Sequence, residues 1–113
     1  MAVFYIDNAA QPTLNMVKGN IYRFDQGNAS NSAAPLLLSE TEDGENAGGV
    51  TYNTGVSYWL GGLEQAKASY VGSAFVNATS RFMQIEVAVD APAVLYYYAF
   101  GTPGMGGSVT ITA

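Results

Sequence analysis

The fold is decided by the stretch FMQIEVAV at residues 82–89, which is followed by DAP at 90–92 and AVLYYYAF at 93–100. In the first run, the apolar side chains at odd-numbered positions up to Val89 share one face, and the two polar side chains lie on the other. A β-strand repeats every two residues, so this alternation predicts a strand buried on one side. Asp and Pro favour a turn, and the aromatic and β-branched residues of the last run predict the next strand.

Three consecutive tyrosines lie at the centre of that second predicted strand. Neighbouring side chains of a strand point to opposite faces, so Tyr96 and Tyr98 share one face while Tyr97 takes the other. One of the two faces belongs to the core. The other is either exposed or covered by a neighbouring subunit, and the sequence leaves both possibilities open.

The rest of the chain shows short strand-like runs between turns rich in Gly, Asn and Pro, without a βαβ rhythm. Helix formers at 63–69 make one short helix possible there. We expect a partly extended connection at 71–80. A glycine-rich loop is expected at 101–107. The pattern predicts an all-β Greek-key β-sandwich of roughly 7–9 strands, in one domain spanning residues 1–113. The further strand-like runs are 3–6, 13–17, 21–25, 36–38, 50–52, 56–60 and 108–112.

The composition argues against several classes of partner. Only 12% of the 113 residues are charged, about half the usual share. The net charge is −5 and the four basic residues are scattered, so nucleic acid and an anionic membrane surface are not expected as partners. Neither a basic leader nor a long apolar run is present, so we expect no signal peptide and no membrane span.

The chain has no histidine and no cysteine. The most common acid–base side chain, thiol nucleophiles and zinc–thiolate sites are therefore excluded. We expect no enzyme activity and no cofactor. An enzyme that relied on carboxylates alone is the remaining alternative.

An acidic loop carries Glu42, Asp43 and Glu45 within residues 40–46. Its polar, glycine-containing composition favours a solvated loop. Calcium binding is the alternative, because this cation prefers several oxygen ligands. The spacing of the carboxylates, however, does not match the calcium loop of an EF-hand.

A bulky cluster of Tyr58, Trp59 and Leu60 comes directly before two glycines at 61–62. One interpretation is that these side chains fill the core. The other is that they anchor an interface, because Trp and Tyr are enriched at the energetic centres of protein contacts.

Short motifs follow one another along the chain in a distinctive order. They are QPTL at 11–14, YRFDQ at 22–26, SNS at 30–32, PL at 35–36, GGV at 48–50, YNTGV at 52–56, AP at 91–92, LYYY at 95–98 and GMGG at 104–107. Together these motifs resemble the cupredoxin-like β-sandwich domain that recurs in virion structural proteins of marine tailed bacteriophages. The resemblance extends over about residues 4–107, and the region 58–81 is longer than in the family pattern.

The resemblance also implies the positions of a copper site, at which this chain has other residues. Copper-competent members have His before the Pro-Leu step and Cys after the tyrosine run, where this chain has Ala34 and Ala99. A second His is replaced by Thr102, and only the axial-type methionine is retained, as Met105. Type 1 copper needs two imidazoles and a thiolate, so we expect a cupredoxin-like scaffold with no metal.

The resemblance implies a virion component, made in the host cytoplasm. We expect a capsid decoration or cement protein that binds the major capsid protein or another virion protein in many copies, as a homo-oligomer. The alternative is a tail or fibre-associated protein that binds a glycan or receptor on the host surface. The candidate interface residues are Tyr58, Trp59, Leu60, Glu42, Asp43 and Glu45.

Overall fold

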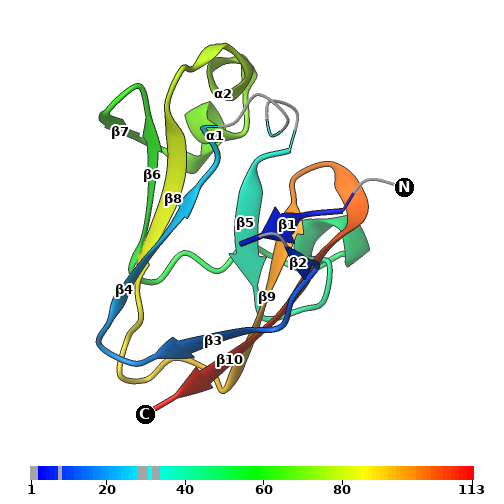
Figure 1. Cartoon of the computed structure of the whole chain (residues 1–113), viewed down its shortest axis with the longest axis vertical. Helices are drawn as coiled ribbons and strands as arrows, with labels where there is room; N and C mark the ends of the chain where they lie inside the picture. Colours follow the sequence, from blue (N-terminus) through cyan, green and yellow to red (C-terminus); the bar gives the residue numbers. More distant parts are fainter. Residues whose placement is uncertain (1–2, 8, 28–30, 32–33) are drawn as a thin grey trace.

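The computed structural model describes residues 3–7, 9–27, 31 and 34–113, and the SNS motif at 30–32 lies largely outside them. Two four-stranded sheets face each other in a β-sandwich (Figure 1). The predicted all-β sandwich is therefore confirmed, with ten strands in the described residues instead of the expected seven to nine. The Greek-key connectivity and the cupredoxin type of the sandwich stay predictions.

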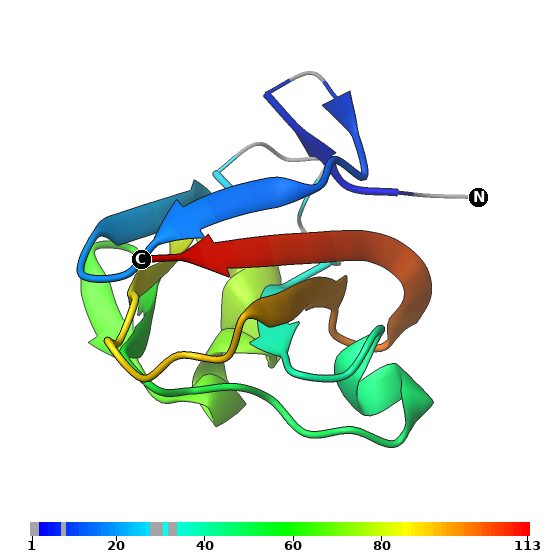
Figure 2. The same cartoon turned by 90° about the horizontal axis from the view of Figure 1, so that it is seen from below.

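The first sheet has the strand order β3-β10-β9-β5, and the second has the order β4-β8-β6-β7. All strand pairs are antiparallel except β3 with β10, which run parallel side by side (Figure 2). A two-stranded hairpin of β1 and β2 lies beside the sandwich. The bounds are β1 Tyr5–Ile6, β2 Ala9–Ala10, β3 Leu14–Val17, β4 Ile21–Asp25, β5 Leu36–Ser39, β6 Val56–Leu60, β7 Leu63–Gln65, β8 Arg81–Glu86, β9 Val94–Ala99 and β10 Thr102–Thr112.

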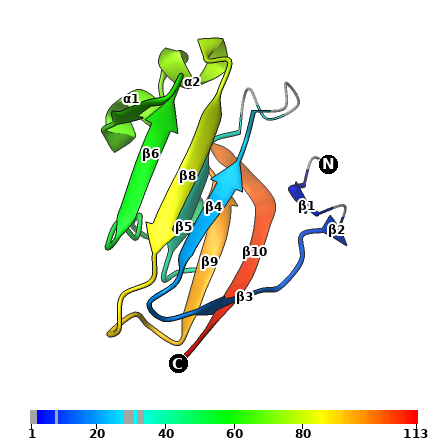
Figure 3. The same cartoon turned by 60° about the vertical axis from the view of Figure 1, so that its left-hand side comes forward.

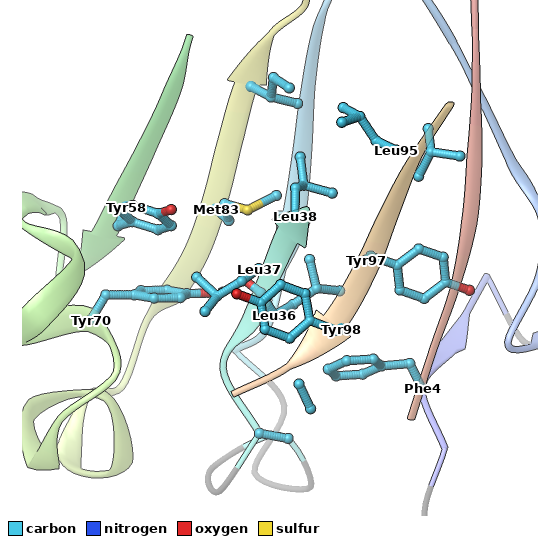
Figure 4. Packing of buried hydrophobic residues seen from close by; sticks show 14 of the residues in the cluster. Phe4, Leu36, Leu37, Leu38, Tyr58, Tyr70, Met83, Leu95, Tyr97 and Tyr98 are labelled. Atoms are coloured by element: carbon cyan, nitrogen blue, oxygen red, sulfur yellow. The ribbon is translucent and has the colours of Figure 1, made fainter. Parts of the chain in front are cut away.

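The core lies between the two sheets, where the alternating side chains of β8 meet the first sheet (Figure 4). Met83 and Ile85 point inward, as the sequence pattern predicts. Strand β5 is buried on both faces, because Leu37 is as fully covered as its neighbours Leu36 and Leu38. A run of leucines with no alternation is typical of a strand with cover on both sides.

Two of the three central tyrosines are fully buried, on opposite faces of β9. The hydroxyl of Tyr97 donates to the carbonyl of Pro12 at 2.6 Å, and burial raises its pKa to about 12. On the other face, the ring of Tyr98 packs against Gly44, where an added Cβ would clash with it. The cover on this face is the chain's own 3-10 helix η2 (Gly44–Ala47), so for Tyr98 both expected alternatives, exposure and a neighbouring subunit, are wrong.

The segment between β6 and β8 differs from the sequence-based expectation. Residues 63–65 form strand β7 and the short helix follows at α1 (Lys67–Tyr70). The partly extended connection expected at 71–80 is only partly correct, because its central residues form a second short helix, α2 (Ser73–Asn77), between extended residues at Gly72 and Ala78. The two helices bury Tyr70 and Phe75 against each other, with ring centroids 5.1 Å apart, and such packing stabilises helices too short to form alone.

The expected glycine-rich loop at 101–107 is also wrong, because strand β10 begins at Thr102 and pairs with β9. A Cβ on Gly106 would lie 1.7 Å from the carbonyl oxygen of Tyr97. Glycine is required there for the close approach of two backbones and not for flexibility. In contrast, the strand expected at 50–52 is reduced to one bridge between Thr51 and Ser39.

Candidate interaction surfaces

The four positions of the implied copper site lie at the end of the first sheet. Ala99 is the register partner of Thr102. Ala34 comes close to the same strand end, because the carbonyl of its neighbour Pro35 accepts the amide of Phe100. Ala34, Ala99 and Met105 are buried in the hydrophobic core. The methyl groups of the two alanines, the hydroxyl of Thr102 and the thioether of Met105 do not form the ligand set of type 1 copper. In the described residues, no group of three or more His, Cys, Asp or Glu side chains could hold a metal ion.

The acidic loop is not uniformly solvated, and its carboxylates point to different partners. Glu42 is exposed. The carboxylate of Asp43 accepts the backbone amide of Gly104 at 3.2 and 3.3 Å. Glu45 belongs to a separate network. A solvated loop is therefore correct for Glu42, whereas the other two carboxylates join the loop to the sandwich.

Glu45 joins η2 to β9 and α1. Its Oε1 accepts the hydroxyls of Tyr98 at 2.8 Å and of Thr51 at 2.9 Å, and its Oε2 pairs with Nζ of Lys67 at 3.0 Å. Burial alone would raise the pKa of Glu45, but these three donors outweigh burial and hold the pKa below its ordinary value. The same burial raises the pKa of Tyr98 well above that of a free tyrosine.

Replacing Tyr98 by phenylalanine is expected to lower the free energy of unfolding by about 1.5–2 kcal/mol, at the low end of the range for a hydrogen bond to a charged group, because Glu45 keeps its other two donors. The ring would still fill its place against Gly44, so the fold is expected to stay intact. Urea unfolding at pH 7 measures the change. Tyr22→Phe, which removes a hydroxyl that accepts the amide of Val17 in a solvent-exposed hydrogen bond, is the matched control with a smaller expected loss. Equal losses in both variants would contradict a structural role for the Glu45 network.

The bulky cluster at 58–60 is divided between two faces of β6. Tyr58 and Leu60 point into the core, whereas Trp59 points outward and is half-buried. The ring of Tyr58 lies 4.7 Å from that of Tyr70, and burial raises its pKa to about 12. Tyr58 and Leu60 are therefore core residues in the folded chain, and Trp59 alone is accessible to a partner.

Trp59 belongs to a row of stacked side chains on the outer face of the second sheet, which we call the aromatic row: Arg23, Phe82 and Trp59. The rings of Trp59 and Phe82 are nearly parallel, with centroids 5.6 Å apart and an angle of 13°. The guanidinium of Arg23 lies over Phe82, with Cζ 4.0 Å from the ring centroid. Sequence reasoning missed Arg23 and Phe82, although outward positions of neighbouring predicted strands were a usable signal.

A second feature that the sequence did not reveal is a buried polar network of Gln26, Tyr70 and Arg81. Gln26 accepts the hydroxyl of Tyr70 at 2.7 Å, and its backbone carbonyl accepts Nη1 of Arg81 at 3.1 Å. In the described residues, no buried side-chain nitrogen or oxygen lacks a hydrogen-bond partner. A network whose polar groups are all satisfied indicates a structural role.

Large aliphatic side chains are exposed around one end of the sandwich, which we call the apolar end: Val17, Ile21, Val89 and Val94. Here the turn from β3 to β4, the loop from β8 to β9 and the C-terminus come together (Figure 3). Val89 was expected to point into the core, but β8 ends at Glu86 and Val89 is 82% exposed in the loop that follows. Exposed apolar groups of this kind often mark contact surfaces.

No family model matches this chain, and searches of the curated proteins and of the solved structures gave no match. The resemblance to the cupredoxin-like domain of phage virion proteins therefore stays a prediction that depends on the sequence motifs. No helix in the described part of the chain is long and apolar enough to cross a membrane.

Proposed function

We propose that this chain is a virion structural protein, a capsid decoration or cement protein that binds the head shell of a tailed phage in many copies. The observation that supports this proposal best is the apolar end, where Ile21 is 59% and Val89 is 82% exposed. Aliphatic groups on a folded domain cost free energy in water, and covering them stabilises an assembly. The major capsid protein is the proposed partner, and a second copy of the chain is the proposed lateral contact.

The polar groups with the most hydrogen bonds support assembly over catalysis. The Glu45 carboxylate already accepts two hydroxyls and an ammonium group, and Gln26 and Tyr70 are bonded to each other. Such groups hold the structure together and have little capacity left for a substrate. What remains accessible is the surface of the sandwich and its ends.

Purified protein mixed with undecorated capsids is expected to sediment with them, and mass spectrometry of the particles measures the copy number. Hundreds of copies per particle support decoration. A few to tens of copies would favour a place in the tail. No sedimentation with shells, together with binding to host-surface glycans on a glycan array, would overturn the decoration proposal in favour of the tail or fibre alternative.

The double substitution Ile21→Lys and Val89→Lys is expected to reduce the amount of shell-bound protein about tenfold or more, because charged side chains would replace apolar contacts. Val76→Lys is the matched control. It is 52% exposed on α2, at the opposite end of the sandwich (Figure 1). Binding is measured by quantitative sedimentation, and thermal unfolding confirms that each variant is folded. Equal losses in the double variant and the control would contradict a role for the apolar end.

A further inference from the structure

The outer face of the second sheet places an aromatic side chain next to a carboxylate at its margin. Trp59 on β6 is the register partner of Glu64 on β7, and β7 is the edge strand of this sheet. Cross-strand partners have their Cβ atoms about 4.5–5.5 Å apart, within reach of long side chains. Glu64 is exposed, and in the described residues the ion pair that is formed joins Lys67 to Glu45 and does not involve it.

The ring of Trp59 has one neighbour in the aromatic row. Phe82 lies on β8, which runs between β6 and β4 (Figure 3). Because Trp59 is on β6 and Arg23 is on β4, the two side chains contact the ring of Phe82 from opposite sides. The indole Nε1 donates to the hydroxyl of Ser57 at 2.9 Å, which fixes the orientation of the ring. The face of the indole ring that points toward β7 and Glu64 is therefore where a further side chain could stack and extend the aromatic row.

The contacts of the chain's own basic residues indicate which kind of side chain binds to an aromatic ring on this protein. Three of the four basic residues lie over an aromatic ring, and none of the three lies over Trp59. Tryptophan attracts cations more strongly than tyrosine or phenylalanine. The pairs are Arg23 with Phe82 at 4.0 Å, Lys67 with Phe100 at 5.7 Å and Arg81 with Phe75 at 5.2 Å.

We propose that the surface between Trp59 and Glu64, the Trp59–Glu64 site, receives an arginine side chain from the partner protein. A guanidinium can stack on the indole, as Arg23 stacks on Phe82, while its N–H groups donate to the carboxylate of Glu64. Trp and Arg are both enriched at the energetic centres of interfaces. The identity of the partner as a virion protein rests on the proposed function, but the arginine chemistry of the site does not.

Charge complementarity favours a cation over a neutral sugar or an anion. The outer face of this sheet carries the exposed carboxylates Asp25, Glu64 and Glu86 and one base, Arg23. The whole chain has a net charge of −5. A basic partner surface would be attracted to this face, and that attraction would weaken as salt increases.

The single tryptophan of the chain makes the site directly observable. The indole N–H resonance of ¹⁵N-labelled protein is followed during titration with a capped peptide of alternating glycine and arginine. A matched peptide with glutamine in place of arginine, and neutral oligosaccharides, are titrated in parallel. A saturable shift with the arginine peptide alone is expected. A response to oligosaccharides only, or equal responses to both peptides, would overturn the arginine assignment.

Two charge-removing variants test the role of the carboxylate. Glu64→Gln is expected to raise the Kd for the arginine peptide about threefold, the usual worth of an exposed ion pair. Glu86→Gln removes the same charge at a more distant position of the face, opposite Ile21, and is expected to raise the Kd clearly less than Glu64→Gln does, because it takes away only long-range attraction. Both residues are exposed, so both variants are expected to fold. An unchanged Kd for Glu64→Gln would refute the site.

Capsid binding separates this inference from the proposed function. If wild-type protein binds shells and Trp59→Ser binds them equally well, the inference fails and the decoration role stands. If wild-type protein does not bind shells, the decoration role fails, and the peptide titration still decides whether the site accepts arginine. Thermal unfolding of Trp59→Ser, compared with wild type, shows whether any loss of binding comes from misfolding, in which case Glu64→Gln replaces it in the shell assay.

Discussion

Arg81→Met is expected to lower the free energy of unfolding by about 3–5 kcal/mol, the largest loss predicted for a single side chain of this protein. Arg81 is only 5% exposed, and in the described residues it has no carboxylate partner. Backbone carbonyls hold its charge instead. Nε donates to Phe75 at 2.6 Å, Nη1 to Gln26 at 3.1 Å and Nη2 to Val76 at 3.1 Å.

Methionine would keep an unbranched side chain in the space that the arginine stem fills, so the loss would come from the hydrogen bonds and not from a cavity. The carbonyl of Phe75 keeps a partner in the amide of Ala78, whereas those of Gln26 and Val76 lose the side-chain donor. A buried carbonyl without a donor costs about 1–3 kcal/mol. The guanidinium also lies over the ring of Phe75, and this attraction would be lost as well.

Urea unfolding at pH 7 measures the loss, and Arg81→Lys is the control. Lysine keeps the positive charge, but its three N–H donors are on one nitrogen atom. It therefore cannot reach all three carbonyls that the planar guanidinium group of arginine contacts. We expect Arg81→Lys to recover about half of the loss. A loss below about 1 kcal/mol for Arg81→Met would mean that water replaces the guanidinium, and that the network does not hold α2 against the sandwich.

The sequence predicted the strands because alternation determines which face of a strand is buried. Strands β4, β5, β6, β8 and β9 lie close to the runs predicted from this period and from their turns. The same period cannot show what covers the opposite face. That is why burial of Tyr98 under η2 was not foreseen, and why Tyr58 and Leu60 were grouped with Trp59 although they point the other way.

Arg81 shows a second limit of the sequence. Among four scattered bases it had no distinguishing neighbour. Its role depends on carbonyls of Phe75, Val76 and Gln26, which backbone geometry brings together from separate segments. Every residue has a carbonyl, so no pattern of residue types reveals such a cluster. The glycine at 106 is a similar case, since its residue type predicts flexibility equally well as close packing.

Gln26→Glu is expected to make the stability of the protein depend on pH between about 4 and 8. Gln26 is 3% exposed. Its Nε2 donates to the carbonyl of Ala34 at 2.8 Å, and its Oε1 accepts the amide of Leu36 at 2.9 Å and the hydroxyl of Tyr70 at 2.7 Å. A protonated carboxyl group reproduces this pattern, because it has one O–H donor and one carbonyl acceptor.

An ionised carboxylate cannot donate to Ala34. One of its oxygens would face the carbonyl oxygen of Ala34, and neither of these two buried atoms could donate a hydrogen bond to the other. Burial therefore raises the pKa of the introduced carboxyl in the folded state above its unfolded value of about 4.3. The charge of Arg81, which bonds the backbone carbonyl at this position, reduces the shift, and the hydroxyl of Tyr70 can still donate. We expect a net shift of about two pKa units, equivalent to about 2–3 kcal/mol.

Because the folded-state pKa is the higher one, the variant is expected to be close to wild type below about pH 4. It loses stability as the pH rises through the folded-state pKa, and it stays destabilised at neutral pH. Urea midpoints measured from pH 4 to 8 test this, relative to wild type. Gln84→Glu, on the outer face of β8 beside Arg23, is the matched control and is expected to show no such decline. A flat difference across this range would mean that water reaches position 26, because only a buried carboxyl group needs to stay protonated.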